Sequence, residues 1–156
     1  MAVMNEAHRP RRIGRSIGAV LAGLLAIIVL SIGTDLLLEA IRVFPRIGEP
    51  VASRLLLLAT AYRAVYGVAG SYIAARLAPD RPMLHALALG VVGVALSAAG
   101  AFATWNGGPA FGPHWYPIAL IAIAMPCAWV GGKFRVMQLR ARPTLGMPGT
   151  WDSRRV

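Results

Sequence analysis

The segment SIGTDLLLEAIRVFPRIGEPVASRLLLLATAYR, from Ser31 to Arg63, joins two long apolar runs and carries ionisable groups on both sides of the junction. Two prolines and a glycine lie between the runs, and these residues end helices and favour turns. Each run is about as long as a transmembrane helix, which needs roughly 20 mostly apolar residues. The segment therefore predicts two antiparallel membrane helices with charged side chains near their shared turn.

Asp35 and Glu39 are four residues apart and Arg42 follows three later, so a continuous helix places all three on one face. The turn centres near Gly48, and residues equally far from it in a helical hairpin lie at the same depth. Asp35 is then level with Arg63, about one helical turn inside the bilayer edge. A single ionised group at mid-bilayer costs about 2.5–3.5 kcal/mol. We expect an Asp35–Arg63 ion pair, with Glu39 as a second acceptor.

Composition extends this prediction to the whole chain. Hydrophobic residues make up 57% and charged residues 14% of the 156 residues, whereas a soluble domain has about 25% charged residues. Four apolar runs predict membrane spans at residues 17–38, 55–77, 83–104 and 116–132. The expected fold is all-α, a transmembrane four-helix bundle over residues 16–133. A basic segment, residues 1–15, precedes it, and a basic tail, residues 134–156, is expected to be disordered.

The distribution of Lys and Arg predicts the direction of the spans. Twelve of the 16 basic residues lie at the termini or between the second and third runs, and three lie near the opposite ends of the spans. Basic residues favour the cytoplasmic side, so both termini are expected to be cytoplasmic. The first run exceeds the length of a signal-peptide core and is expected to be retained. Arginine-rich, lysine-poor usage favours a bacterial protein of the inner membrane.

Small residues recur at helical spacing and predict close helix packing, because small side chains let helices approach in lipid. Thr60, a further candidate for the site of Asp35, Glu39 and Arg63, shares a face with Arg63, as do the predicted packing residues Gly67 and Gly70. The other predicted packing faces are Gly90, Gly93, Ser97 and Gly100 in the third run, and Gly14, Gly18, Ala22 and Ala26 in the first. Pro126 interrupts the fourth run and predicts a kink.

Several functional classes are disfavoured. The sequence contains no GxxxxGK[ST], HExxH or GxSxG motif, so no catalytic residue, cofactor or enzymatic activity is predicted. Cys127 is the only cysteine and the three histidines lie far apart, which gives no metal site. The net charge of +10 is clustered between the apolar runs and at the termini, without the aromatic interleaving of a nucleic-acid surface.

Two interpretations of the charged cluster stay open. In the first, the protein is structural or accessory and the Asp35–Arg63 pair fixes helix register. In the second, it is a small transporter or channel subunit that uses Asp35, Glu39 and Arg63 as a proton, ion or anion site, the default hypothesis for ionisable groups in a membrane. The expected partners are the lipid bilayer and anionic lipid at the cytoplasmic face. A homo-oligomer and a membrane partner protein are alternatives that the sequence leaves open.

The run LLLATAYRAVYGVAGSYIAARLAPDRPMLHALALG, followed by ATWN and WYPIALIAIAMPCAWVGGK, resembles uncharacterised small four-span bacterial membrane proteins. The resemblance covers Ile17 to Lys133 and implies the four-span fold, but it brings no activity and no site residues. Small four-span multidrug exporters need a central acid in the first span, and Asp35 is too near the edge. Fluoride channels have a different glycine–arginine pattern and lack this charge bias.

Overall fold

A computed structural model describes residues 9–45, 49–108 and 112–141 of the chain, and this part is all-α, without strands. It contains four helices: α1 (Arg9–Ala40), α2 (Ser53–Leu77), α3 (Pro82–Thr104) and α4 (Trp115–Arg140). Alanine and leucine, both strong helix formers, recur throughout the four helices. α3 begins directly at Pro82, and proline favours the first position of a helix because its missing N–H needs no partner there.

Helix α1 ends earlier than the face of Asp35, Glu39 and Arg42 predicts. Its last residue is Ala40, and Arg42 has a φ of 58°, in the left-handed region. The Val43 N–H donates to the Leu38 carbonyl at 2.9 Å, which satisfies one of the last helical acceptors. The expectation that Arg42 continues the helical face is therefore wrong, because α1 has ended before this residue and its backbone is in the left-handed region.

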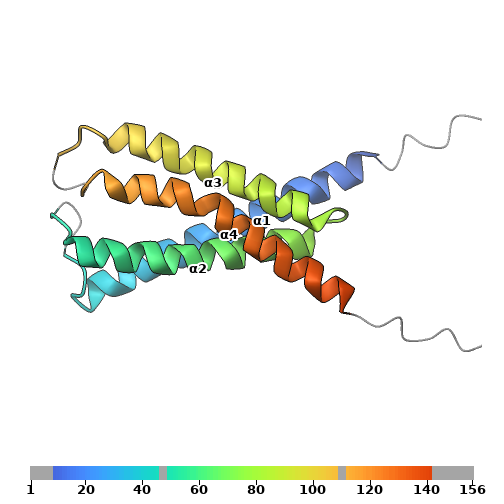
Figure 1. Ribbon diagram of the computed structural model, residues 1–156, viewed down its shortest axis with the longest axis horizontal. Coiled ribbons are helices and arrows are strands. Elements are labelled where there is room, and N and C mark those ends of the chain that lie inside the picture. The colour runs from blue at the N-terminus through green and yellow to red at the C-terminus, as the bar shows by residue number, and fades with distance from the viewer. Residues whose placement is uncertain (1–8, 46–48, 109–111, 142–156) are drawn as a thin grey trace, which may run out of the picture.

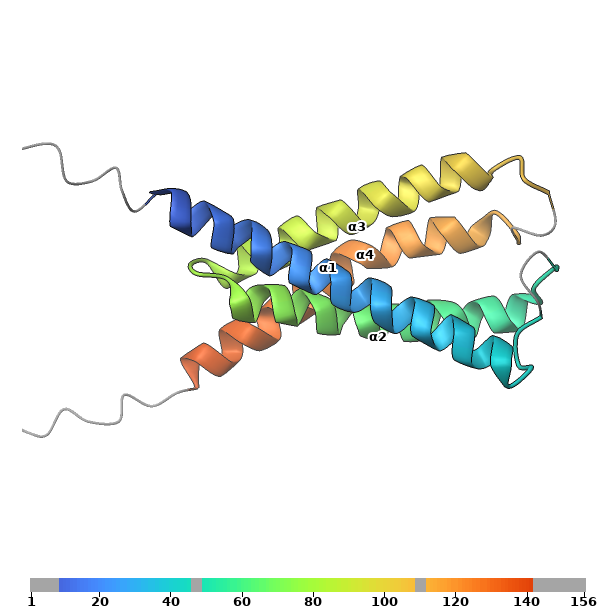
Figure 2. The same cartoon turned by 180° about the vertical axis from the view of Figure 1, so that it is seen from behind.

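The helices run antiparallel in sequence order (Figures 1 and 2). Residues 41–45 and 49–52, which connect α1 and α2, lie at the same end of the molecule as the junction of α3 and α4; we call this the distal end. The α2–α3 connection, the start of α1 and the end of α4 lie at the opposite, proximal end. α1 packs mainly on α2, and both α2 and α3 pack on α4.

Three of the four helices are long and apolar enough to cross a membrane: residues Ile13–Ala40 of α1, Pro82–Thr104 and Trp115–Arg140. The 18-residue windows that qualify them have mean hydropathies of 2.5, 2.1 and 1.5. α2 has 25 residues, but Arg63 and three tyrosines, Tyr62, Tyr66 and Tyr72, reduce its apolar character. The fold thus contains three helices compatible with a membrane protein and one that is equally long but more polar.

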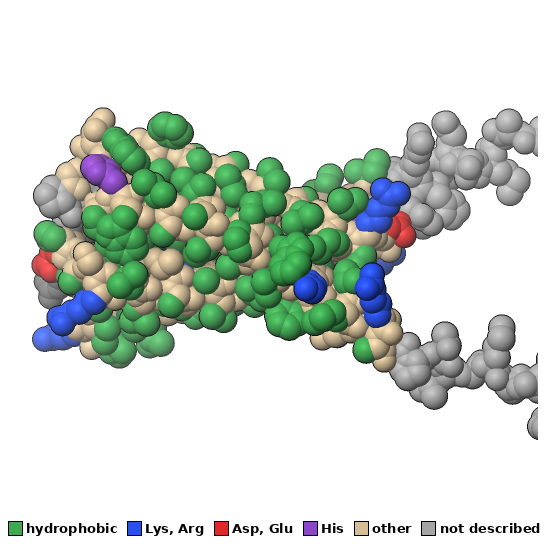
Figure 3. All heavy atoms as spheres, viewed as in Figure 1, with side chains coloured by type: hydrophobic (Ala, Val, Ile, Leu, Met, Phe, Trp, Pro, Cys, Tyr) green, Lys and Arg blue, Asp and Glu red, His purple; other side chains and the backbone are tan. Residues whose placement is uncertain are grey.

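Large apolar side chains lie outside this bundle and small ones inside. Among the described residues no large side chain is fully buried, and the buried apolar residues are seven alanines and two leucines, Leu56 and Leu89. Phe102 is 85% exposed and Val65 is 64% exposed. Figure 3 shows hydrophobic side chains along the length of the visible face, with most Lys and Arg gathered at the two ends. A hydrocarbon surface around a core of small residues is the pattern expected in lipid.

Glycines make the closest helix crossings. A Cβ on Gly23 of α1 would lie 2.5 Å from the carbonyl oxygen of Gly70 on α2. A Cβ on Gly90 of α3 would lie 2.6 Å from the Cβ of Ala128 on α4, and one on Gly131 of α4 would lie 2.8 Å from the Cβ of Ser71. These distances are too short for any larger side chain, so glycine is what allows the backbones to approach.

Some of the predicted small-residue faces do not pack. Gly14, Gly18 and Gly100 have open space where a side chain would stand. Near the end of α3 Ala101 is buried and Gly100 is not, because three full turns from Gly90 correspond to about 11 residues and a spacing of 10 rotates off the contact. On α1 the buried residues are Ala19 and Gly23, a neighbouring stripe. Gly14, Gly18 and Gly100 therefore take no part in helix packing within the described chain, and packing of these residues against a second chain stays a prediction.

The last helix also differs from its expected length. α4 continues to Arg140, so residues 134–140 are helical and not part of a disordered tail, and residues 142–156 lie outside the described part of the chain. Pro126 stands inside this helix. Both cartoons show α4 bending part-way along its length (Figures 1 and 2). A mid-helix proline removes one backbone hydrogen bond and is a common cause of such a bend.

Candidate functional site

The structure brings Asp35 of α1 and Arg63 of α2 together near the distal end. Arg63 Nη2 lies 2.6 Å from Asp35 Oδ2, and the two side chains are 27% and 34% exposed, respectively. The guanidinium carbon also lies 5.8 Å from the ring centroids of both Tyr62 and Tyr116. Arg63 is therefore held by a carboxylate on α1, a neighbouring ring on its own helix and a ring on α4, which fixes its direction between three helices.

Tyrosines extend this pair into a polar contact between α1 and α2. The Tyr62 hydroxyl donates to Asp35 Oδ1, so both carboxylate oxygens have partners. One turn along α2, the Tyr66 hydroxyl hydrogen-bonds Thr34 Oγ1 at 2.8 Å. Five residues, Thr34, Asp35, Tyr62, Arg63 and Tyr66, form what we call the polar clasp. Sequence reasoning missed Thr34 and both tyrosines, although tyrosines at i and i+4 beside an arginine signal polar tips that need partners.

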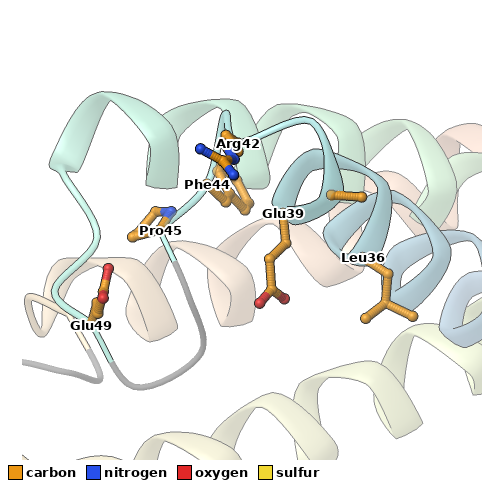
Figure 4. A pocket seen from close by; sticks show the side chains of 7 residues that line it. Leu36, Glu39, Arg42, Phe44, Pro45 and Glu49 are labelled. Atoms are coloured by element: carbon orange, nitrogen blue, oxygen red, sulfur yellow. The ribbon is translucent and has the colours of Figure 1, made fainter.

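Glu39 and Thr60 do not join the polar clasp. The Thr60 hydroxyl donates to the Leu56 carbonyl of its own helix at 2.8 Å. Glu39 makes no ion pair with Arg63 in the described part of the chain. It lines a separate distal hollow of about 840 Å³ with Arg42, Phe44 and Glu49 among its other residues. Figure 4 shows the side chains of Glu39 and Arg42 pointing in different directions.

A cavity of about 350 Å³ lies between the four helices and reaches the polar clasp. Asp35 and Arg63 line part of it, and most of the remaining wall is hydrocarbon, including Ile27, Leu89 and Ile123. Of the predicted packing residues, Gly67, Gly93 and Ser97 also line this cavity. A Cβ on Gly93 would meet only Ala124 Cβ at 3.7 Å, an ordinary contact, so the helices are less tightly packed here than at Gly90.

Other polar groups gather at the proximal end. The Lys133 ammonium lies 4.4 Å from the centroid of the Trp129 ring, and the Tyr72 hydroxyl donates to Gln138 Oε1 at 2.8 Å. Both contacts lie at or near the surface, and aromatic and basic residues of this kind are enriched at membrane–water interfaces. Within the described residues no group of three or more His, Cys, Asp or Glu side chains forms a metal site.

Comparison of the chain with models of protein families, with curated proteins and with solved structures found no match. The geometry of the polar clasp and of the adjoining cavity therefore carries the functional argument.

Proposed function

We propose that this chain is a multi-pass integral membrane protein of a structural or accessory kind, and that the Asp35–Arg63 pair fixes α1 on α2. The observation that carries the proposal is the polar clasp itself, in which both oxygens of Asp35 are occupied by groups from α2. An Asp35 carboxylate whose two oxygens both accept hydrogen bonds favours a structural role, because a group in a proton relay must be able to release its partner. The described parts of α3 and α4 contain no Asp or Glu to continue a proton path. We propose no enzymatic activity.

The proposed arrangement is a four-span bundle in a bacterial inner membrane with the proximal end cytoplasmic. Support comes from the hydrocarbon surface and from the clustering of basic residues near the proximal end, such as Arg76, Lys133 and Arg140. α2 crosses the membrane in this arrangement because the polar clasp neutralises Arg63. The bilayer, with anionic lipid at the cytoplasmic face, is the proposed partner.

Cysteine labelling tests the crossing of α2 directly. Val51→Cys and Ala78→Cys, each in a Cys127→Ser background, place a thiol at either end of this helix. A membrane-impermeant maleimide applied to intact spheroplasts should label the first variant and should label the second only after permeabilisation. Gly107→Cys is the matched control for the distal side. Equal labelling of positions 51 and 78 from outside would contradict the four-span arrangement.

A charge exchange tests the role of the pair. Asp35→Arg and Arg63→Asp each place like charges together, and we expect each to lower the yield of folded protein severely. The double exchange restores opposite charges and should recover much of the yield. Glu39→Arg is the control and should fold normally, because Glu39 lies outside the polar clasp. Normal folding of both single variants would refute the structural role and favour a functional ion site.

A further inference from the structure

The cavity between the helices receives one small polar side chain from each of them. These are Ser31 from α1, Ser71 from α2, Ser97 from α3 and Cys127 from α4. They lie far apart in sequence, and only the assembled bundle brings them to one space. The volume of about 350 Å³ is at the small end of the range for ligand pockets, about 300–1,000 Å³.

The serine hydroxyls facing this cavity have no hydrogen-bond partner among the described residues. Helical hydroxyls usually bond the carbonyl one turn back, as Thr60 and Thr104 do here at 2.8 Å. Ser71 is the clearest exception, because its side chain is only 2% exposed and still makes no such bond. The one fully buried side-chain nitrogen or oxygen without a partner among the described residues is Arg135 Nε, so the serine oxygens keep accessible surface. The cavity wall therefore offers hydrogen bonds that a bound molecule can reach and that the protein leaves unused.

The ion pair at one end of the cavity indicates the charge of a ligand. Asp35 already balances the charge of Arg63, and an additional ion would bring an uncompensated charge into a medium of low dielectric constant. The guanidinium group has five N–H donors, and among the described residues only Asp35 accepts a hydrogen bond from it. The Arg63 N–H groups without a partner are donors, and the serine hydroxyls that line the cavity can donate as well. A neutral ligand with acceptor oxygens therefore fits better than an ion.

We propose that this cavity binds a neutral, lipid-soluble molecule with an apolar chain and a carbonyl group. The carbonyl oxygen accepts hydrogen bonds from Arg63 or from the serine hydroxyls, and the chain lies against the isoleucines and leucines of the wall. The proposal rests on the proposed membrane location, since such a ligand arrives from the lipid phase. It does not depend on the role of the ion pair in folding.

Cys127 is a built-in reporter of occupancy, because it lines the cavity and is the only cysteine of the chain. The full chain in phosphatidylcholine nanodiscs is treated with N-ethylmaleimide, and modification is followed by intact mass. Three probes of similar length are compared at equal mole fraction in the lipid: 2-undecanone, undecane and decanoate. We expect the ketone to slow modification about fivefold with saturation, as occupancy at about four times the Kd requires. Undecane and decanoate should change the rate less than twofold.

Ser97→Phe fills the cavity from α3, and protection by the ketone should disappear in this variant. Val91→Phe adds the same bulk on the exposed face of α3, where Val91 is 59% exposed, and should retain full protection. Ser71→Ala removes a hydroxyl without adding volume and should weaken protection even if Ser97→Phe fails to fold. If the reagent does not modify Cys127, the midpoint of thermal unfolding with each probe gives the same comparison, with a rise expected for the ketone alone.

Equal protection by undecane and the ketone would show hydrocarbon partitioning and overturn the proposal. Stronger protection by decanoate would show an anion site and overturn it as well, as would the absence of protection by every probe. None of these results bears on the charge exchange, which measures folding without ligand, so a failed ligand site and a failed structural pair are distinguishable.

Discussion

Helices α1 and α2 contact each other in two different ways at two levels along their lengths. Near Gly23 and Gly70 the backbones touch, and no side chain has room between them. Twelve residues further along α1, or about 18 Å of helix, the contact near Asp35 and Arg63 consists of long polar side chains. The glycine crossing works by shape, and the polar clasp works by charge and hydrogen bonding. The comparison shows how one helix pair obtains close approach at one level and a fixed register at the other.

Overfilling the glycine crossing should give the largest effect. In Gly70→Val the new side chain meets Ile27 and lies against the Gly23 carbonyl, whose oxygen would stand 2.7 Å from the added Cβ. Overpacking typically costs about 1–3 kcal/mol, and two facing backbones leave little room to adjust, so we expect a loss of about 3 kcal/mol or more. Thermal unfolding in detergent micelles measures it.

Gly14→Val is the matched control for this variant, because Gly14 lies on the same helix pair with open space around it. The control should unfold at the temperature of the wild-type protein. A Gly70→Val protein as stable as the control would mean that the crossing is not close-packed.

Removing the carboxylate of the polar clasp should give the next largest effect. Asp35→Ala leaves Arg63 without its ion-pair partner and Tyr62 without its acceptor. Breaking a buried pair costs about 3–5 kcal/mol and an exposed pair about 0–1, so a pair that is about one-third exposed should lose about 2 kcal/mol. Denaturant unfolding checks this value. Glu39→Ala should change stability by less than about 0.5 kcal/mol, and an equal loss in both variants would show that the ion pair contributes nothing specific.

Removing one hydroxyl from the polar clasp should give the smallest effect. Tyr62→Phe keeps the ring and removes one hydrogen bond to Asp35, for an expected loss of about 1 kcal/mol. Tyr72→Phe removes an exposed hydrogen bond to Gln138 at the proximal end and should cost less. The difference between the two unfolding free energies compares a hydroxyl inside the polar clasp with one at the surface. A larger loss of stability in Tyr72→Phe than in Tyr62→Phe would mean that the hydrogen bond at the proximal end stabilises the fold more than the one in the polar clasp.

The sequence predicted the all-α class and the meeting of Asp35 with Arg63, because a short turn forces two helices into a hairpin and counting residues from the turn shows which residues lie level with each other. It did not predict which side chains complete the contact. Tyr62, Tyr66 and Thr34 find their partners through the rotation of each helix about its axis, which residue counting does not give. The same limitation explains why Gly14 and Gly18 do not pack within the chain. They lie on a face of α1 next to the buried face of Ala19 and Gly23. The cavity was also missed, since its polar groups come from four separate helices.

The central claim is that Asp35 and Arg63 stabilise the bundle through each other. A double-mutant cycle with Asp35→Asn and Arg63→Gln, measured as unfolding free energies in one lipid environment, tests it most directly. We predict a coupling energy of about 1–2 kcal/mol, so that the double variant loses clearly less than the sum of the two single losses. Strictly additive losses would mean that the two charges do not act as a pair, and the account of the polar clasp would be wrong.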